Sequence, residues 1–371
     1  MKQVRPLKQL LDGCQLHIGD CLTTLKQLDS ESVHCCITSP PYWGLRDYGM
    51  EEQIGLEETP QEFIDRLVEV FREVKRVLRE DGTLWVNIGD SYCAGSRSSQ
   101  RPQSFHADEA HDLPLSRRNK ASGDLKDKDL VGIPWMLAFA MRKDGWWLRQ
   151  DIVWDKPNCM PESVQDRCTK SHEYLFLFSK SKSYFFDYKA IRSETSNKRS
   201  VWRVSPKPYP EAHFAVFPPE LIEPCVLAGT SEHGCCEQCG SPFERIIEKP
   251  DMSQRPTRSS DSKHEKKKHM NDNWQGVPKS AGSKYQQWRN KNPDITVGWK
   301  QTCVCKGAGV IPATVLDPFG GSGTTAGVAL LRGRRAILCE LNEDFARLIP
   351  SRIESISGRS KEQRTMQEWI E

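Results

Sequence analysis

Four consecutive residues near the N-terminus have the types and the order needed to hold an amino group. The stretch CITSPPYWGLRDYG, residues 36–49, places Ser39, Pro40, Pro41 and Tyr42 directly after a short apolar run. The Ser39 hydroxyl and the Pro40 carbonyl can each accept a hydrogen bond from an exocyclic amine, which favours a more nucleophilic nitrogen. The two prolines hold these acceptors rigidly because their rings fix φ. The Tyr42 ring offers a face on which a flipped base can stack.

A glycine loop near the other end of the chain is a second candidate site. The stretch TVLDPFGGSGTTAGVALLRG, residues 314–333, has the pattern of a strand, a glycine turn and a helix. This arrangement brings bare backbone and a helix N-terminus to a ligand. The next expected strand ends at Glu340, whose carboxylate can bind ribose hydroxyls. The loop thus favours an adenosine-containing ligand. Gly321 and Gly323 also fit the dinucleotide pattern, so a nicotinamide or flavin oxidoreductase is an alternative.

The two motifs, in this order, resemble those of the amino-group DNA methyltransferases, which methylate the exocyclic nitrogen of cytosine or adenine. In that family Ser-Pro-Pro-Tyr is the catalytic loop, and F-x-G-x-G is the S-adenosylmethionine loop. The order of the loops is similar to that of the beta class. The resemblance implies catalytic roles for Ser39, Pro40, Pro41 and Tyr42, and cofactor binding by Asp20, Asp317, Phe319, Gly321, Gly323, Thr324 and Glu340. It assigns Asp317 either to orienting the loop or to contacting the methionine amino group.

The order of the expected elements agrees with the fold that this resemblance implies. Residues 32–37 are typical of a short strand. Residues 59–82 predict a helix in which Thr59 and Glu62 form a capping box and Gly82 ends the last turn. Strands that alternate with helices predict a parallel sheet. We therefore expect a Rossmann-like α/β methyltransferase core: a mixed, mostly parallel sheet of about seven strands flanked by helices, with a circularly permuted motif order and a cysteine-clasped insert.

The first residue of the catalytic motif bears on which base is methylated. The family tends to place Ser there for N4 of cytosine, and Asp or Asn for N6 of adenine, so Ser39 favours cytosine. The expected function is site-specific transfer of a methyl group from S-adenosylmethionine to the N4 amine of cytosine in double-stranded DNA, with base flipping. The alternatives are an adenine-specific enzyme of the same class, an RNA or protein-amide methyltransferase, a nicotinamide oxidoreductase, and a non-catalytic zinc-containing DNA-binding protein.

The cysteines divide into a candidate metal site and ordinary thiols. Fourteen cysteines without a secretion signal indicate a reducing compartment. Four of them can supply thiolates to one structural zinc in tetrahedral geometry: Cys236, Cys239, Cys303 and Cys305. Cys235 is an alternative to Cys236, and four ordinary thiols are the competing interpretation. Pro224-Cys225 superficially resembles the nucleophile of carbon-5 cytosine methylation, but Cys225 is interpreted as core packing.

The chain is expected to have three parts. Residues 1–232 hold the catalytic part of the core with a loop insert at 91–128, and residues 307–371 hold the cofactor-binding part. Between them, residues 233–306 are expected to form a zinc-clasped basic insert that is a candidate for target recognition. Residues 249–300 contain 12 Lys and Arg against 5 Asp and Glu, an excess suited to phosphate contacts. The aromatic residues of this insert are Trp274, Tyr285, Trp288 and Trp299.

The sequence also bears on partners and location. No stretch is long and apolar enough to span a membrane, and no cleavage site follows the N-terminus. We expect a protein of the cytoplasm of a bacterial or phage-infected cell that binds double-stranded DNA and no membrane. A cognate restriction endonuclease acting on the same site is a candidate partner. The oligomeric state, the recognition sequence, and which of the inserts 91–128, 189–212 and 233–306 reads the bases stay open.

Overall fold

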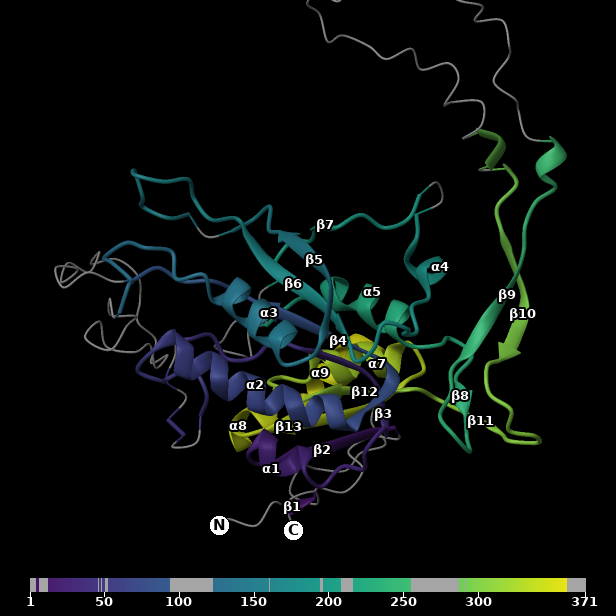
Figure 1. Cartoon of the computed structure of the whole chain (residues 1–371), viewed down its shortest axis with the longest axis horizontal. Helices are drawn as coiled ribbons and strands as arrows, with labels where there is room; N and C mark the ends of the chain where they lie inside the picture. Colours follow the sequence, from purple (N-terminus) through teal and green to yellow (C-terminus); the bar gives the residue numbers. More distant parts are fainter. Residues whose placement is uncertain are drawn as a thin grey trace, which may run out of the picture.

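The described residues form a mixed sheet between two layers of helices (Figure 1). The computed structural model describes residues 5–6, 13–45, 47, 49–50, 53–93, 123–159, 161–193, 196–207, 216–254, 287–289 and 291–358. Most of the expected loop insert at 91–128 and much of the basic insert therefore lie outside the described residues. Among the helices in these ranges, none is long and apolar enough to cross a membrane.

The sheet has the strand order β1-β2-β13-β12-β3-β4-β6-β5-β7. Strands β2, β13, β12, β3 and β4 are parallel neighbours, whereas β6 runs antiparallel to β4 and β5. This confirms the mixed, mostly parallel sheet, to which the short strands β1 and β7 are added at the two edges. The bounds are β1 Arg5–Pro6, β2 Cys14–Ile18, β3 Val33–Thr38, β4 Leu78–Ile88, β5 Trp147–Asp155, β6 His172–Ser179, β7 Val201–Arg203, β12 Thr314–Asp317 and β13 Arg335–Glu340.

Two apolar clusters fill the space between the sheet and its helices. One joins the sheet to α1 (Cys21–Leu25), α2 (Pro60–Val77) and α3 (Ile133–Lys143). The other joins its opposite face to α5 (Pro219–Gly229), α7 (Thr324–Leu331) and α9 (Ile349–Ser357). The short helices α4 (Tyr188–Ile191) and α8 (Glu343–Ala346) complete the core. Because β2 pairs with β13, an N-terminal segment belongs to the same part of the sheet as the glycine loop.

The helix predicted over 59–82 forms with its capping box but ends earlier than expected. Thr59 accepts from the Glu62 amide and Glu62 accepts from the Thr59 amide, as predicted. The prediction that Gly82 ends the helix is wrong, because α2 ends at Val77 and the chain passes directly into β4. A Cβ on Gly82 would lie 3.1 Å from the backbone oxygen of His34, so the glycine permits a close approach between β3 and β4.

The insert and the residues just after it form two small antiparallel pairs of strands beside the core. Strand β8 (Cys235–Cys236) pairs with β11 (Val310–Ile311), and β9 (Phe243–Glu248) pairs with β10 (Ile295–Gln301). We call β9 and β10 the arm; in Figure 1 they extend away from the sheet, next to β8 and β11. A turn of 3-10 helix, η1 (Met252–Gln254), follows β9.

Contacts at two points hold the arm to the core. Arg245 on β9 donates to Asp187, next to α4, at 2.6 Å. Asp294, just before β10, forms ion pairs with Lys189 and Arg192. Trp299 stacks on His233 with ring centroids 5.5 Å apart, so its ring packs within the insert.

Candidate active site

Two loops from distant parts of the chain meet at the carboxyl edge of the sheet. Strands β3 and β12 are parallel neighbours, with Cys35 opposite Val315 and Cys36 opposite Leu316. The carboxyl ends of parallel strands lie at the same edge, where open α/β sheets bind their ligands. The two loops border one cavity of about 210 Å³. The expected site residues that line it are Ser39, Pro40, Pro41, Tyr42, Asp20, Asp317, Phe319, Gly321, Thr324 and Glu340.

The Tyr42 side chain is held in one orientation by its neighbours. Its hydroxyl donates to Glu173 Oε2 at 2.8 Å, and Asn87 Nδ2 donates to the same oxygen at 3.2 Å. Burial, and then the Glu173 carboxylate, raise the pKa of Tyr42 well above its usual range, so the phenol stays neutral. A Cβ on Gly89 would lie 2.6 Å from Tyr42 Cε2. The absent side chain at Gly89 therefore makes room for the ring.

Sequence reasoning missed a polar group on the cavity wall. Lys156 forms an ion pair with Glu173, and its Nζ lies 4.1 Å from the centre of the Trp154 ring. Lys156, Glu173, Asn87 and Trp154 all line the cavity. The antiparallel register of β5 and β6 sets Trp154 opposite Glu173, and β4, on the other side of β6, supplies Asn87. The available signal was a charged residue beside each apolar strand: Lys156 after the first, in VWDKP, and Glu173 at the start of the second, in SHEYLF.

Asp317 links the catalytic loop to the glycine loop. It is 1% exposed, and it accepts hydrogen bonds from Thr38 Oγ1 at 2.6 Å, Thr325 Oγ1 at 2.7 Å and the Phe319 amide at 3.1 Å. Burial raises the pKa of Asp317 to about 6. These donors join the end of β3, the turn after β12 and the first turn of α7. The geometry thus favours the orienting role over contact with the methionine amino group.

Glu340 lies at the end of β13 with acceptor capacity to spare. Its Oε2 accepts from the Gly321 amide at 2.7 Å, and its Oε1 accepts from the Asn342 amide at 2.9 Å. Burial raises the pKa of Glu340 to about 7. Each oxygen can accept a further hydrogen bond, as ribose hydroxyls would require. Nearby, Asp20 caps α1 by accepting from the Thr23 amide at 2.8 Å.

The glycine loop contains one residue that faces the ligand and one that serves packing. Ser322 lines the cavity, and its buried hydroxyl has no hydrogen-bond partner among the described residues. Gly323 differs from the expectation because it does not line the cavity. Its φ of 88° is left-handed, and a Cβ there would lie 2.8 Å from Ile349 Cγ2 on α9.

The cavity lining suits a ligand that has a sugar with free hydroxyls and a flat aromatic base. Glu340 offers carboxylate oxygens, and the unpaired Ser322 hydroxyl is available to a polar group of the ligand. Apolar parts of the wall come from Phe217, Phe319, Leu341 and Phe345. Such a mixture of apolar surface and a few placed polar groups is typical of cofactor sites.

Two residues near the motifs belong to the core. Trp43 is 3% exposed, and its Nε1 donates to the Glu57 carbonyl at 2.9 Å, so its ring belongs to the core. Cys225 is fully buried on α5, and burial raises its thiol pKa well above the usual range. The interpretation of Cys225 as core packing is confirmed. The four thiols predicted to bind zinc lie together beside the arm, away from the cavity lining.

The fold and the shared cavity define a Rossmann-like methyltransferase. A family model described as DNA methylase, for N6 and N4 methyltransferases, matches residues 33–236 and 243–351. The chain therefore belongs to this family of DNA amino-methyltransferases, and S-adenosylmethionine is its methyl donor. Membership removes the oxidoreductase and the non-catalytic DNA-binding protein as alternatives.

Similar proteins agree with this assignment. The type II methyltransferase M.XycI of Xanthomonas campestris pv. cyanopsidis is 55% identical over 232 residues, which cover 61% of this chain and 76% of the relative. M.SmaI of Serratia marcescens is 48% identical over 235 residues, which cover 62% of this chain and 79% of the relative. A solved structure described as PvuII DNA methyltransferase (cytosine-N4-specific) aligns with a TM-score of 0.54 and 16% identity, covering 94% of this chain and 92% of that chain. At that identity the likeness shows the shared fold.

Proposed function

We propose that this enzyme methylates the N4 amine of cytosine at a specific site in double-stranded DNA. The observation that carries the proposal is the position of Ser39: a hydroxyl, and not a carboxylate, begins the catalytic motif and lines the cavity shared with the glycine loop. Adenine N6 in the same kind of site is the second candidate. Methyl transfer to RNA or to a protein amide is a more distant one.

The residues of the cavity account for the chemistry of an amine. The Ser39 hydroxyl and the Pro40 carbonyl accept hydrogen bonds from the amino group, which frees the nitrogen lone pair from the ring. Tyr42, held by Glu173, presents its ring to the flipped base. S-adenosylmethionine supplies an electrophilic methyl group on a sulfonium, which becomes a thioether on transfer while the amine loses one proton. No covalent bond between enzyme and base is required.

The product separates cytosine from adenine. The full chain is incubated with duplex DNA and labelled S-adenosylmethionine, and the DNA is digested to nucleosides for mass spectrometry. We expect label in N4-methyldeoxycytidine. Label in N6-methyldeoxyadenosine would refute the cytosine proposal while leaving the family assignment intact. Single-stranded RNA of the same sequence is the matched substrate control.

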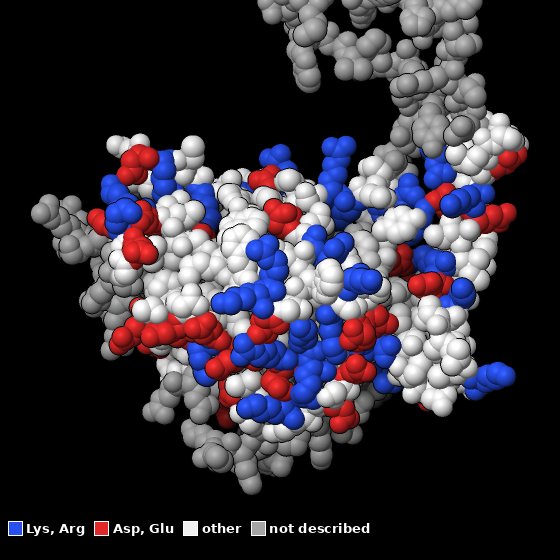
Figure 2. Space-filling view, in the orientation of Figure 1, with Lys and Arg blue, Asp and Glu red and all other residues white. Residues whose placement is uncertain are grey.

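We further propose that residues 233–306 contribute to target recognition. Figure 2 shows Lys and Arg interspersed with Asp and Glu over this face of the core, whereas residues 249–300 carry a clear basic excess. Lys and Arg side chains in such an excess can bind the phosphates of DNA. Of the four aromatic residues named for this insert, Trp274 and Tyr285 lie outside the described residues.

Replacing residues 255–286 by a short Gly/Ser linker tests this role, because β9, η1 and β10 stay in place. We expect loss of site-specific methylation with S-adenosylmethionine binding retained, as measured by calorimetry. Unchanged site preference would show that the insert takes no part in recognition.

Partnership with a restriction endonuclease and a cytoplasmic location are supported by bacterial relatives named as type II methyltransferases. Protection of methylated plasmid against a panel of endonucleases checks the first of these.

A further inference from the structure

Four thiols from two distant parts of the chain converge beside the arm. The Sγ atoms of Cys236, Cys239, Cys303 and Cys305 all lie within 4.8 Å of one another. A tetrahedral zinc with Zn–S bonds of about 2.3 Å needs Sγ–Sγ separations of about 3.8 Å, so small side-chain movements complete the tetrahedron. We propose that these residues bind one structural zinc ion, and that this ion fastens the arm to the sheet.

The backbone around the cluster brings the two pairs of thiols together. The Gly240 amide donates to the Cys236 carbonyl at 2.7 Å, which closes a tight turn around the first pair. Gly240 has a left-handed φ of 70°, which favours glycine. Strand β11 sets Val310 opposite Cys236, and the Glu237 amide donates to the Gly309 carbonyl at 2.9 Å. The segment that follows the second pair is thereby anchored next to the first.

Strand geometry decides which of two adjacent cysteines can bind the metal. Successive residues of a strand face opposite sides, so Cys235 and Cys236 on β8 cannot both face the cluster. Cys236 belongs to the group of four, and Cys235 is fully buried outside it. The alternative that the sequence left open is thus decided in favour of Cys236.

Polar groups around the thiols suit sulfur that carries negative charge. Gln301 Nε2 donates to Cys303 Sγ at 3.1 Å and to the Cys305 carbonyl at 2.5 Å. Ser241 Oγ lies 3.3 Å from Cys239 Sγ, where its hydroxyl can donate to a thiolate. Such surrounding donors orient metal ligands and tune their affinity.

A partly buried cation, Arg79, adjoins the cluster. Zinc binding releases the four thiol protons to solvent, and a Zn²⁺ with four thiolates has a net charge of −2. The Arg79 side chain is 14% exposed and forms an ion pair with Asp81, and its guanidinium also donates to the Cys239 carbonyl at 2.5 Å and to Ser241 Oγ at 3.5 Å. Arg79, whose charge is shared with Asp81, thus holds the backbone of Cys239 and the Ser241 hydroxyl in place beside the thiols. It also connects the site to β4.

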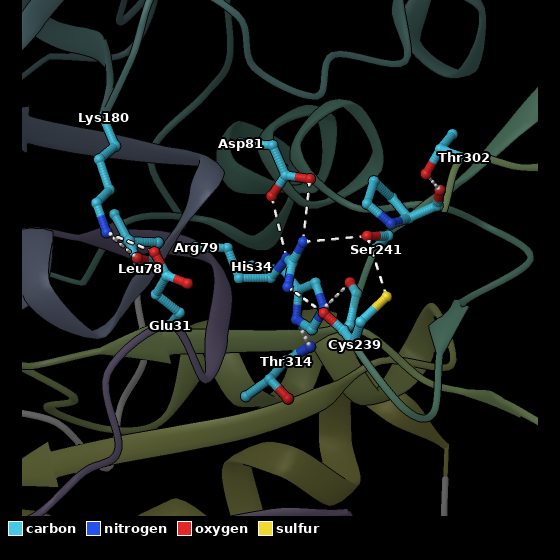
Figure 3. Close-up of polar contacts among 12 residues, drawn as sticks. Glu31, His34, Leu78, Arg79, Asp81, Lys180, Cys239, Ser241, Thr302 and Thr314 are labelled. Carbon is cyan, nitrogen blue, oxygen red and sulfur yellow. Dashed lines mark hydrogen bonds and ion pairs between the residues drawn. The ribbon is translucent and has the colours of Figure 1, made fainter. Parts of the chain in front are cut away.

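Figure 3 shows a second connection, through His34 on β3. The Thr314 amide donates to His34 Nδ1 at 3.0 Å, so Nε2 carries the hydrogen and donates to the Gly240 carbonyl at 3.0 Å. His34 and Thr314 lie near the starts of β3 and β12, at the edge of the sheet opposite the active-site cavity. A closed site with four thiols, distant from the reacting groups, suits a structural metal.

Metal analysis of the full-length protein tests the proposal directly. The chain is purified from zinc-supplemented cells without chelators, and zinc is measured by mass spectrometry. We expect about one zinc per chain, lost in both Cys239→Ala and Cys303→Ala. Cys168→Ala, at an exposed cysteine outside the group, is the matched control and keeps the metal. Folded wild-type protein with less than about 0.1 zinc per chain, or retention of zinc by both variants, would overturn the site.

Two further measurements keep the test decisive if those variants do not fold. Cobalt(II) exchanged into the wild-type protein is expected to give the visible absorption of a tetrahedral thiolate site. Gln301→Ala, which leaves all four ligands in place, is expected to lower zinc affinity about tenfold. Octahedral cobalt spectra, or an unchanged affinity in Gln301→Ala, would contradict the proposal. Neither measurement depends on which base the enzyme methylates.

Discussion

The hydrogen bond from Thr38 to Asp317 is the most informative single contact of the active site. Replacement of Thr38 by Val keeps the shape of the side chain and removes the hydroxyl that donates to Asp317 Oδ1 at 2.6 Å. A hydrogen bond to a buried charged group contributes about 2 kcal/mol, and one to a neutral group about 1 kcal/mol. The cost of Thr38→Val therefore depends on the charge of Asp317.

The pKa of Asp317 sets the direction of this dependence. Because burial raises it from 3.8 to about 6, the folded state binds the proton more tightly, and ionisation of Asp317 costs stability as the pH rises through this interval. Loss of the Thr38 hydroxyl raises the pKa of Asp317 further, because its hydrogen bond favours the carboxylate. We expect Thr38→Val to lower the free energy of unfolding by about 1 kcal/mol near pH 5 and about 2 kcal/mol near pH 8.

Urea denaturation at the two pH values measures this difference. Glu340, whose pKa is about 7, titrates in both proteins, so its contribution cancels in the comparison. Thr83→Val is the control: Thr83 is equally buried, and its hydroxyl contacts Cys35 Sγ and accepts from the Trp85 indole instead of donating to a carboxylate. Its cost should not change with pH. A Thr38→Val cost that is equal at both pH values, or larger at low pH, would refute the account of Asp317.

Three further predictions concern the base and the thiol. Gly89→Ala should lower kcat/KM for DNA with little change in S-adenosylmethionine affinity, because its Cβ would lie 2.6 Å from Tyr42 Cε2; unchanged turnover would contradict this. Tyr42→Ala should raise the activation free energy of methyl transfer by about 1–3 kcal/mol through lost stacking. Tyr42→Phe keeps the ring and should lose less activity in steady-state assays. Equal losses would argue against stacking. Cys225→Ala should retain methyl transfer, and an inactive but folded variant would show that the thiol takes part.

Features that depend on neighbours in the chain were predictable. The capping box of α2 joins Thr59 and Glu62 through short-range hydrogen bonds, so a stretch of four residues defines it. The end of α2 was not predictable in this way. Leu78 leaves the helix because it pairs with Val33 in the sheet, and that pairing overrides the apparent stop signal at Gly82.

The sequence by itself predicted the family, the two motif loops and the two groups of cysteines near 236 and 303, because these follow from residue types at fixed spacing. The tertiary structure alone decided what each motif residue contacts. Glu173 and Lys156 reach the cavity only through the register of β5 and β6, and Glu173 lies 131 positions from its partner Tyr42. Packing against Ile349 assigns Gly323 to the support of the loop, and strand alternation selects Cys236 over Cys235. Such contacts arise from strand pairing and helix packing between distant segments, which local spacing does not encode.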